Sequence, residues 1–172
     1  MRGNIFSPEY LISNGIAAVL LLLTFTRPAT ARSLLCILFT GAAFFNGIAA
    51  FMHPEWYLSY ADIAAIPSYE RIINGAFSRH ITAYVLTIAI GQLSIGIFIG
   101  SKGWLQKTAL AGAVVFLLAI SPLGAGAAFP CTIILAAACV VLLFKHSNET
   151  LPEIFNSRVL KHRRPIGLAY PL

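Results

Sequence analysis

Charged side chains are scarce in this chain: only 10% of its 172 residues are Asp, Glu, Lys or Arg, whereas 58% are hydrophobic. An ordinary soluble domain carries roughly 25% charged residues, so this composition excludes a water-soluble fold with a normal polar surface. Several apolar runs approach the roughly 20 residues that cross the hydrocarbon core of a bilayer. The composition therefore predicts an integral membrane protein.

Catalytic and metal-binding signatures are missing from the sequence as well. Cys36, Cys131 and Cys139 all lie within apolar runs and form no CxxC pair, which is typical of small buried residues. No nucleophile–base arrangement, phosphate-binding loop or HExxH motif occurs. The net charge of +6 is spread beside the apolar runs instead of forming one patch, which argues against nucleic-acid binding. We therefore expect no metal site, and a non-catalytic protein rather than an enzyme.

The apolar runs predict an all-α fold, a polytopic membrane helix bundle over residues 1–145 followed by a basic cytoplasmic tail over residues 146–172. No span has an Asp, Glu, Lys or Arg in its central part, which argues against an ion-coupled pump. The expected five spans cover residues 10–25, 34–52, 81–100, 108–120 and 127–144.

Residues 53–80 form the one long connection between apolar runs. This stretch contains two of the four histidines, three of the six acidic residues and a concentration of Trp and Tyr. Aromatic residues at this density beside a span are typical of a helix that lies along the lipid headgroups. We expect an outer interfacial amphipathic segment, broken at Pro67, with a turn at Asn74-Gly75.

The distribution of Lys and Arg predicts the orientation. The first and third connections have two basic residues each and the tail has five including Lys145, whereas the fourth connection has none. Basic residues favour the cytoplasmic side, so the N-terminus is expected outside and the C-terminus inside. Segment 53–80 and the SPLGAGAAFP turn then share the outer face.

This shared face is the first candidate site. A pocket there would bind a quinone, a lipid or a pigment. Its histidines could instead anchor helix ends, or ligate a metal together with the carboxylates of Glu55, Asp62 and Glu70, in a site that also contains Arg79. The turn could equally be a plain tight connection. The candidate ligand-binding residues are His53, Trp56, Tyr60, His80, Tyr84, Pro122, Gly124, Gly126 and Phe129.

Polar and small residues inside the spans indicate helix contacts. Asn46 and Gln92 should face protein or water, and neutral amides of this kind commonly fasten helices together. Small residues let helix backbones approach closely, and the basic tail suits headgroups or protein. The candidate interface residues, toward membrane lipids or other integral membrane subunits, are Gly41, Gly47, Gly96, Gly100, Arg163 and Arg164.

The stretches FTGAAFFNGIAAFMHPEW, GAFSRHITAY and SPLGAGAAFP resemble those of DoxX-like small bacterial membrane proteins. The resemblance covers residues 32–145 and implies a compact bundle of about four helices in the bacterial inner membrane. Some members of that family are linked to quinone-dependent sulfur oxidation. Five spans and an extended basic tail depart from the family pattern.

These observations support two main hypotheses of function. The first is a non-catalytic accessory subunit of a larger membrane complex, of the energy-transducing kind, because the small-residue faces suit close helix contact. The alternative is a DoxX-like, redox-associated protein that binds a small molecule in the outer pocket. A transporter is a third and weaker hypothesis, since the central parts of the spans lack ionisable groups and the chain shows no duplicated halves.

Overall fold

A computed structural model describes residues 6–145, 149–154 and 156, and all of its elements are helical. Five helices are long: α1 (Pro8–Thr26), α2 (Pro28–Met52), α5 (Ile81–Ile99), α6 (Gly103–Ile120) and α7 (Cys131–Phe144). The connection between α2 and α5 folds into four short helices, η1 (Pro54–Ser59), α3 (Tyr60–Ile63), α4 (Pro67–Ile72) and the π-helical turn η2 (Ile73–Phe77). A 3₁₀ stretch, η3 (Ser121–Ala127), joins α6 to α7.

Proline determines where several of these elements begin. Pro8, Pro28, Pro54 and Pro67 each stand at the start of a helix, where the missing backbone N–H costs no hydrogen bond. The residue before a proline avoids the α region, so α1 ends just before Arg27 and α2 just before His53. Ser7 also caps α1, because its hydroxyl accepts a hydrogen bond from the backbone N–H of Tyr10.

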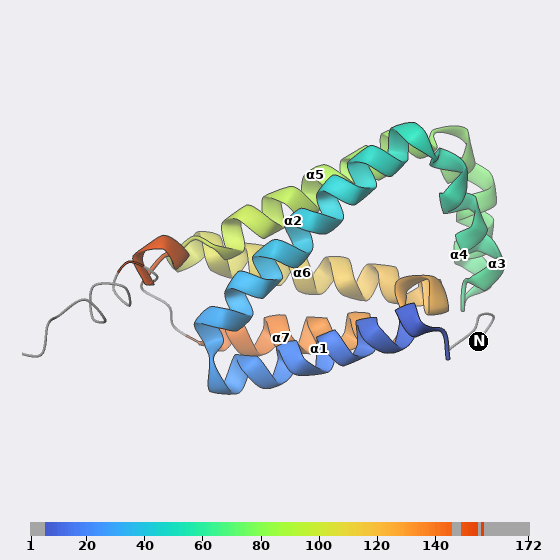
Figure 1. Cartoon of the computed structure of the whole chain (residues 1–172). Helices are drawn as coiled ribbons and strands as arrows, with labels where there is room; N and C mark the ends of the chain where they lie inside the picture. Colours follow the sequence, from blue (N-terminus) through green and yellow to red (C-terminus); the bar gives the residue numbers. More distant parts are fainter. Residues whose placement is uncertain (1–5, 146–148, 155, 157–172) are drawn as a thin grey trace, which may run out of the picture.

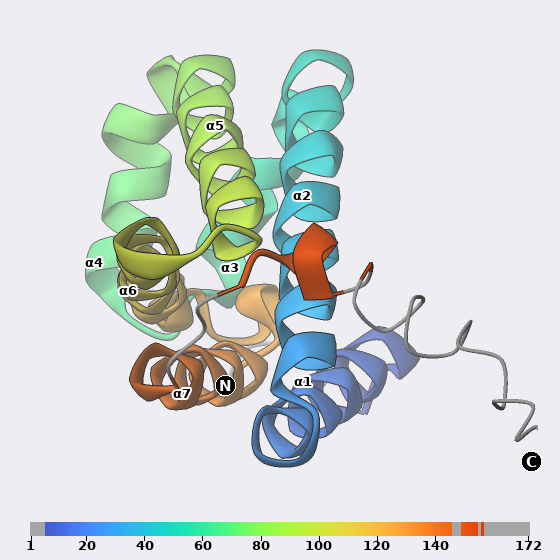
Figure 2. The ribbon, with the colours of Figure 1, turned by 90° about the vertical axis from the view of Figure 1, so that its left-hand side faces the viewer.

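The long helices run alternately between two ends of the molecule (Figure 1). We call one the aromatic end, which comprises residues 53–80 and 121–130. The other is the basic end, which comprises residues 26–33, 100–107, 145 and 149–154. Helices α2 and α5 pack side by side and diverge from α1, α6 and α7 toward the aromatic end, where α3 and α4 bridge the two groups (Figures 1 and 2).

The divergence places the main hydrophobic core nearer the basic end. Its buried side chains come from all five long helices, and the largest of them are Leu35, Phe39, Ile99, Leu110 and Leu142. The outward faces of the same helices carry many exposed apolar side chains, as expected for surfaces in contact with lipid.

Among the residues that the structure describes, four helices are long and apolar enough to cross a membrane: α1, α2, α5 and the stretch Gly103–Ala127 that begins with α6. The predicted spans 10–25, 34–52 and 81–100 correspond to the first three, although α2 begins six residues earlier than expected because Pro28 starts it directly after α1. The fourth helix begins at Gly103, not at residue 108.

The expected fifth span, 127–144, is shorter in the structure. Residues 127–130 lie outside α7, which has 14 residues and therefore a length of roughly 21 Å, less than the ~30 Å hydrocarbon core. Much of α7 is buried among its neighbours. A count of five membrane crossings stays a prediction.

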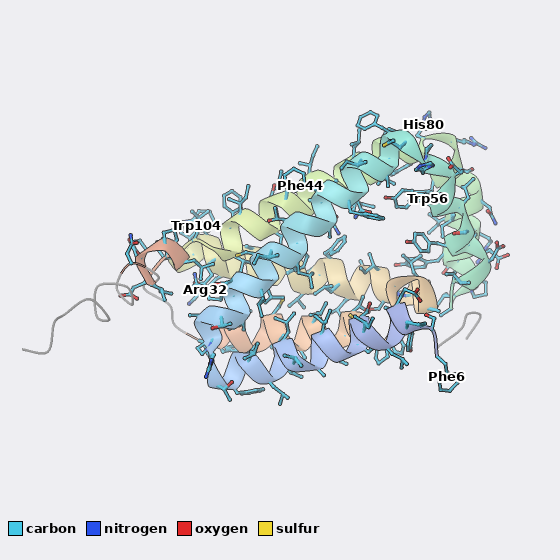
Figure 3. The ribbon with its side chains drawn as sticks, in the orientation of Figure 1. Phe6, Arg32, Phe44, Trp56, His80 and Trp104 are labelled. Carbon is cyan, nitrogen blue, oxygen red and sulfur yellow. The ribbon has the colours of Figure 1, made fainter. Side chains whose placement is uncertain are left out.

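Two local predictions were wrong. Asn74-Gly75 does not form a turn, because the helix continues through both residues as the π-helical turn η2. Arg27 and Arg32 are the two basic residues of the first connection and were expected to border a tight turn on either side, but Arg32 does not. It lies inside α2 and is only 2% exposed, because its guanidinium reaches carbonyl groups at the basic end. Arg32 and His80 lie at opposite ends of the molecule (Figure 3).

Candidate ligand cavity at the aromatic end

A cavity of about 300 Å³ lies where α2 and α5 diverge from α6, and the short helices of residues 53–80 line it at the aromatic end. Its volume is at the lower end of the roughly 300–1,000 Å³ that is usual for small-molecule sites. Most of its wall is apolar, with a few polar groups. The lining residues are Asn46, Tyr57, Tyr60, Tyr69, Ile72, Ile73, Phe77, Val85, Ile88, Gln92, Phe116, Ile120, Leu123, Gly126 and Ala127.

A chain of hydrogen bonds connects the polar groups of this wall. The hydroxyl of Tyr57 donates to Oδ1 of Asn46 at 2.8 Å, and Nδ2 of Asn46 donates to Oε1 of Gln92, also at 2.8 Å. The three residues come from η1, α2 and α5. Gln92 is only 6% exposed, and its amide N–H groups make no hydrogen bond with any residue in the described part of the chain. The chain therefore ends in an unused donor at the cavity wall.

Tyr60 provides a second polar group. Its hydroxyl makes no hydrogen bond with the residues that the structure describes, whereas the hydroxyl of Tyr69 donates to the carbonyl of Ala119. Burial raises the pKa of Tyr60 above its ordinary value, so this hydroxyl remains protonated at neutral pH. Tyr60 can therefore donate a hydrogen bond to a ligand, while Tyr69 fastens α4 to α6.

The predicted meeting of segment 53–80 with the turn after α6 is confirmed. The backbone N–H of Ala65 donates to the carbonyl of Pro122 at 3.0 Å. Gly126 packs so closely on Tyr60 that a Cβ there would lie 2.6 Å from the ring. Gly124 has φ +64°, a conformation that favours glycine, and a Cβ there would lie 3.2 Å from the carbonyl oxygen of Ile63. These two glycines thus let the turn after α6 pack closely against residues 53–80 and close the cavity at the aromatic end.

The predicted site residues separate into three groups. Tyr60 and Gly126 line the cavity. Pro122, Gly124 and Phe129 instead border a second hollow of about 290 Å³, together with Ala65, Ile66 and Ser121.

The third group lies outside both cavities. His53 ends α2, stacks on Trp56 with ring centroids 4.2 Å apart, and approaches Glu55 at 3.2 Å. His80 precedes α5 and is exposed, and Tyr84 is 45% exposed and stacks on Phe77. These positions match the interpretation of the histidines as anchors at helix ends. Within residues 6–145, 149–154 and 156, no three His, Cys, Asp or Glu side chains are grouped to hold a metal ion.

The candidate interface glycines divide by position. Gly96 and Gly100 serve contacts within the chain, since a Cβ on Gly96 would lie 2.5 Å from Oγ1 of Thr40 and one on Gly100 would lie 3.7 Å from Sγ of Cys36. A Cβ on Gly41 or Gly47 would meet nothing within 4 Å. Arg163 and Arg164 lie outside the described residues.

Sequence reasoning missed most of the cavity wall. It singled out Asn46 and Gln92 as polar groups that should face protein, and their mutual hydrogen bond confirms this. Tyr57, Tyr69 and Phe77 belonged to an aromatic-rich stretch, but nothing in the pattern distinguished inward from outward rings. No sequence pattern marks the apolar lining residues of α5 and α6, because apolar residues occur on every face of these helices. These residues are Val85, Ile88, Phe116 and Ile120.

No family model, curated protein or solved structure matches the chain. The interpretation of the cavity therefore depends on its own geometry.

Proposed function

We propose that this chain is an integral membrane protein that binds one small amphipathic molecule in the cavity at the aromatic end. A quinone, a lipid and a pigment are the candidate ligands. The observation that carries the proposal is the hydrogen-bonded chain Tyr57–Asn46–Gln92, which ends in unused amide donors at an otherwise apolar wall.

The arrangement has the chemistry of a binding site. Apolar and aromatic walls exclude water, and a few polar groups fix orientation. Gln92 and Tyr60 both offer donors, which suits a ligand with carbonyl or ether oxygens on a flat ring. A volume of about 300 Å³ holds a ring-sized head, so any long chain would extend into the surrounding lipid. The resemblance to DoxX-like proteins supports a quinone among the three.

The placement in a membrane completes the proposal. The basic residues favour a cytoplasmic basic end, so the cavity faces the outer side of a bacterial inner membrane, with the N-terminus outside and the tail inside. In this arrangement α7 is the fifth crossing, and residues 53–80 lie at the outer interface.

The test is native mass spectrometry of the gently solubilised protein, with an absorption spectrum of the same fraction. The matched variants are Ile88→Trp, which fills the cavity from α5, and Ile90→Trp on the same helix, which is 66% exposed and does not line it. We expect a stoichiometric small molecule on the wild type and on Ile90→Trp but not on Ile88→Trp. An empty wild-type chain, or equal occupancy of both variants, would refute the proposal.

One observation favours a second function, that of a non-catalytic subunit of a larger membrane complex. Gly41 and Gly47 on α2 face open space, and between them Phe44 and Phe45 are 63% and 62% exposed (Phe44 is labelled in Figure 3). Together these glycine and phenylalanine residues form an exposed apolar surface, which suits contact with the helix of a neighbouring membrane subunit. The same mass measurement distinguishes the two functions, because a subunit would appear in a larger assembly that Gly41→Leu disrupts.

A further inference from the structure

A third cavity lies at the basic end, opposite the proposed ligand cavity and independent of it. Its volume is about 340 Å³, and it is lined by Pro28, Ala29, Arg32, Gln106, Leu142, Lys145 and Ile154. The lining polar side chains in the described part of the chain are two cations and one amide, with no carboxylate among them.

Gln106 is a buried polar residue of this cavity that does not hold the described helices together through hydrogen bonds. It belongs to the first turn of α6, is only 3% exposed and lines this cavity, yet it makes no hydrogen bond with the residues that the structure describes. The side chain as a whole is buried, but its amide is not one of the fully enclosed polar groups without a partner, so it opens onto the cavity. A molecule in the cavity can therefore supply the hydrogen bonds that the described residues do not.

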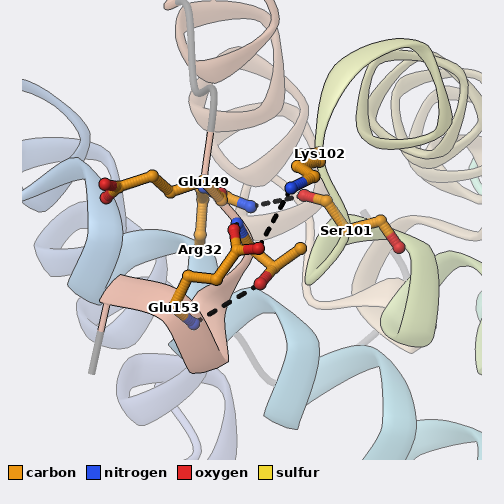
Figure 4. Close-up of polar contacts among 6 residues, drawn as sticks. Arg32, Ser101, Lys102, Glu149 and Glu153 are labelled. Atoms are coloured by element: carbon orange, nitrogen blue, oxygen red, sulfur yellow. Dashed lines mark hydrogen bonds and ion pairs between the residues drawn. The ribbon is translucent and has the colours of Figure 1, made fainter. Parts of the chain in front are cut away.

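The two cations give the cavity a fixed positive charge. Arg32 is held by carbonyls of the basic end, through Nη2 to Ser101 at 2.6 Å and to Ile99 at 3.3 Å, and through Nη1 to Glu149 at 3.3 Å. Figure 4 shows Arg32 beside Ser101 and Glu149. Three carbonyls from two segments of the chain therefore orient the guanidinium.

Lys145 is held in the same way at the end of α1. Its ammonium group donates to the carbonyls of Thr24 at 2.6 Å and Phe25 at 3.4 Å. An ammonium group has three donors, so one remains for a ligand.

The start of α2 adds backbone donors to the same wall. Arg27 provides no side-chain cap, and Pro28 and Ala29 line the cavity. The first N–H groups of a helix have no partner within the helix, and the helix dipole makes this end favourable for an anion. Helix α2 has 25 residues, so the contribution of its dipole at this end is fully developed.

We infer that the cavity at the basic end binds the phosphate group of an anionic membrane lipid. The amide of Gln106, the third donor of Lys145 and the start of α2 supply hydrogen bonds to the phosphate oxygens, while Arg32 supplies charge. Pro28, Leu142 and Ile154 make the rest of the wall apolar, which suits the glycerol backbone and the first part of an acyl chain. Basic pockets between membrane helices on the cytoplasmic side are typical sites for anionic headgroups.

The experiment is native mass spectrometry of the full chain released from nanodiscs that contain equal amounts of phosphatidylglycerol and phosphatidylcholine. We expect retained phosphatidylglycerol on the wild type and about tenfold less on Gln106→Leu, the effect of one lost hydrogen bond to a charged group. Lys107→Gln is the matched control, because it removes a charge at the same end from an exposed residue that does not line the cavity.

A second measurement separates binding from folding. Adding phosphatidylglycerol should raise the melting temperature of the wild type and of Lys107→Gln, and should leave that of Gln106→Leu unchanged, since a ligand stabilises only a state that binds it. Equal retention of both lipids, or equal retention by both variants, would overturn the inference. Stabilisation by inorganic phosphate alone would overturn the lipid as the source of the phosphate.

Discussion

The contact between α2 and α5 offers a sharp test of the packing that supports the cavity. An Ala at position 96 would place its Cβ 2.5 Å from Oγ1 of Thr40, 3.0 Å from the backbone nitrogen of Thr40 and 3.2 Å from the carbonyl oxygen of Cys36. An ordinary carbon contact needs roughly 3.5–4.0 Å, so the two helices must separate by about half an ångström. The side chain of Thr40 can rotate away, but the backbone of α2 cannot.

We expect Gly96→Ala to lower the free energy of unfolding by about 1–3 kcal/mol, the usual effect of overpacking. For a chain of this size that is a fall in melting temperature of roughly 2–4 °C per kcal/mol. The control is Gly91→Ala on the same helix, where the added Cβ meets nothing within 4 Å. There Ala should raise stability by about 0.5–1 kcal/mol, because it favours the helix and strains no contact.

The assay is thermal unfolding of the detergent-solubilised protein, with the two variants measured beside the wild type. Adding Thr40→Ala to Gly96→Ala should restore part of the loss but not all of it, since the backbone contact remains. If both glycine variants changed stability in the same direction, or if Thr40→Ala restored the full loss, the close approach of the two backbones would be refuted. Gln92 lies one turn from Gly96, so the separation should also weaken its hydrogen bond with Asn46.

Three further predictions follow from single contacts. Tyr57→Phe leaves Oδ1 of Asn46 without its hydrogen-bond donor, so it should lower the free energy of unfolding by about 1–2 kcal/mol, as measured by thermal unfolding. The fraction of the chain that carries a ligand in native mass spectrometry should fall as well. Arg32→Met should destabilise the protein by roughly 2–3 kcal/mol because helix-end carbonyls lose a charged donor, whereas Arg27→Met at an exposed position should have little effect. Hydrogen bonds from the backbone N–H of Thr150 and the ammonium group of Lys102 lower the pKa of Glu153. The stability that Glu153 contributes is therefore present above its unfolded pKa and is lost as the pH falls through its folded pKa. Protection factors of the amides of residues 151, 153 and 154, which correct for the intrinsic pH dependence of exchange, should then fall, and protection factors that do not change with pH would contradict this.

The positions of most helices could be predicted from the sequence because local signals set them. Prolines and long apolar runs depend only on neighbouring residues, and they placed α1, α2 and α5 correctly within a few residues. Arg32 shows the limit of such reasoning. A basic residue near a turn normally faces water or headgroups, and only the proximity of the α5 carbonyls explains why this one is buried.

By itself, the sequence determined that the chain is helical and apolar enough for a membrane, where α1 and α5 lie to within two residues, and that residues 53–80 meet the turn after α6. Only the tertiary structure decided which faces of the helices pack together. In a water-soluble protein, amphipathic periodicity would reveal the inner face, but here lipid and core are equally apolar, so the pattern that distinguishes them is absent. Gly96 and Gly41 therefore look alike in the sequence, although one sits against a neighbouring backbone and the other faces open space. For the same reason the cavity wall, assembled from η1, α2, α5 and α6, became visible only once the helices were placed.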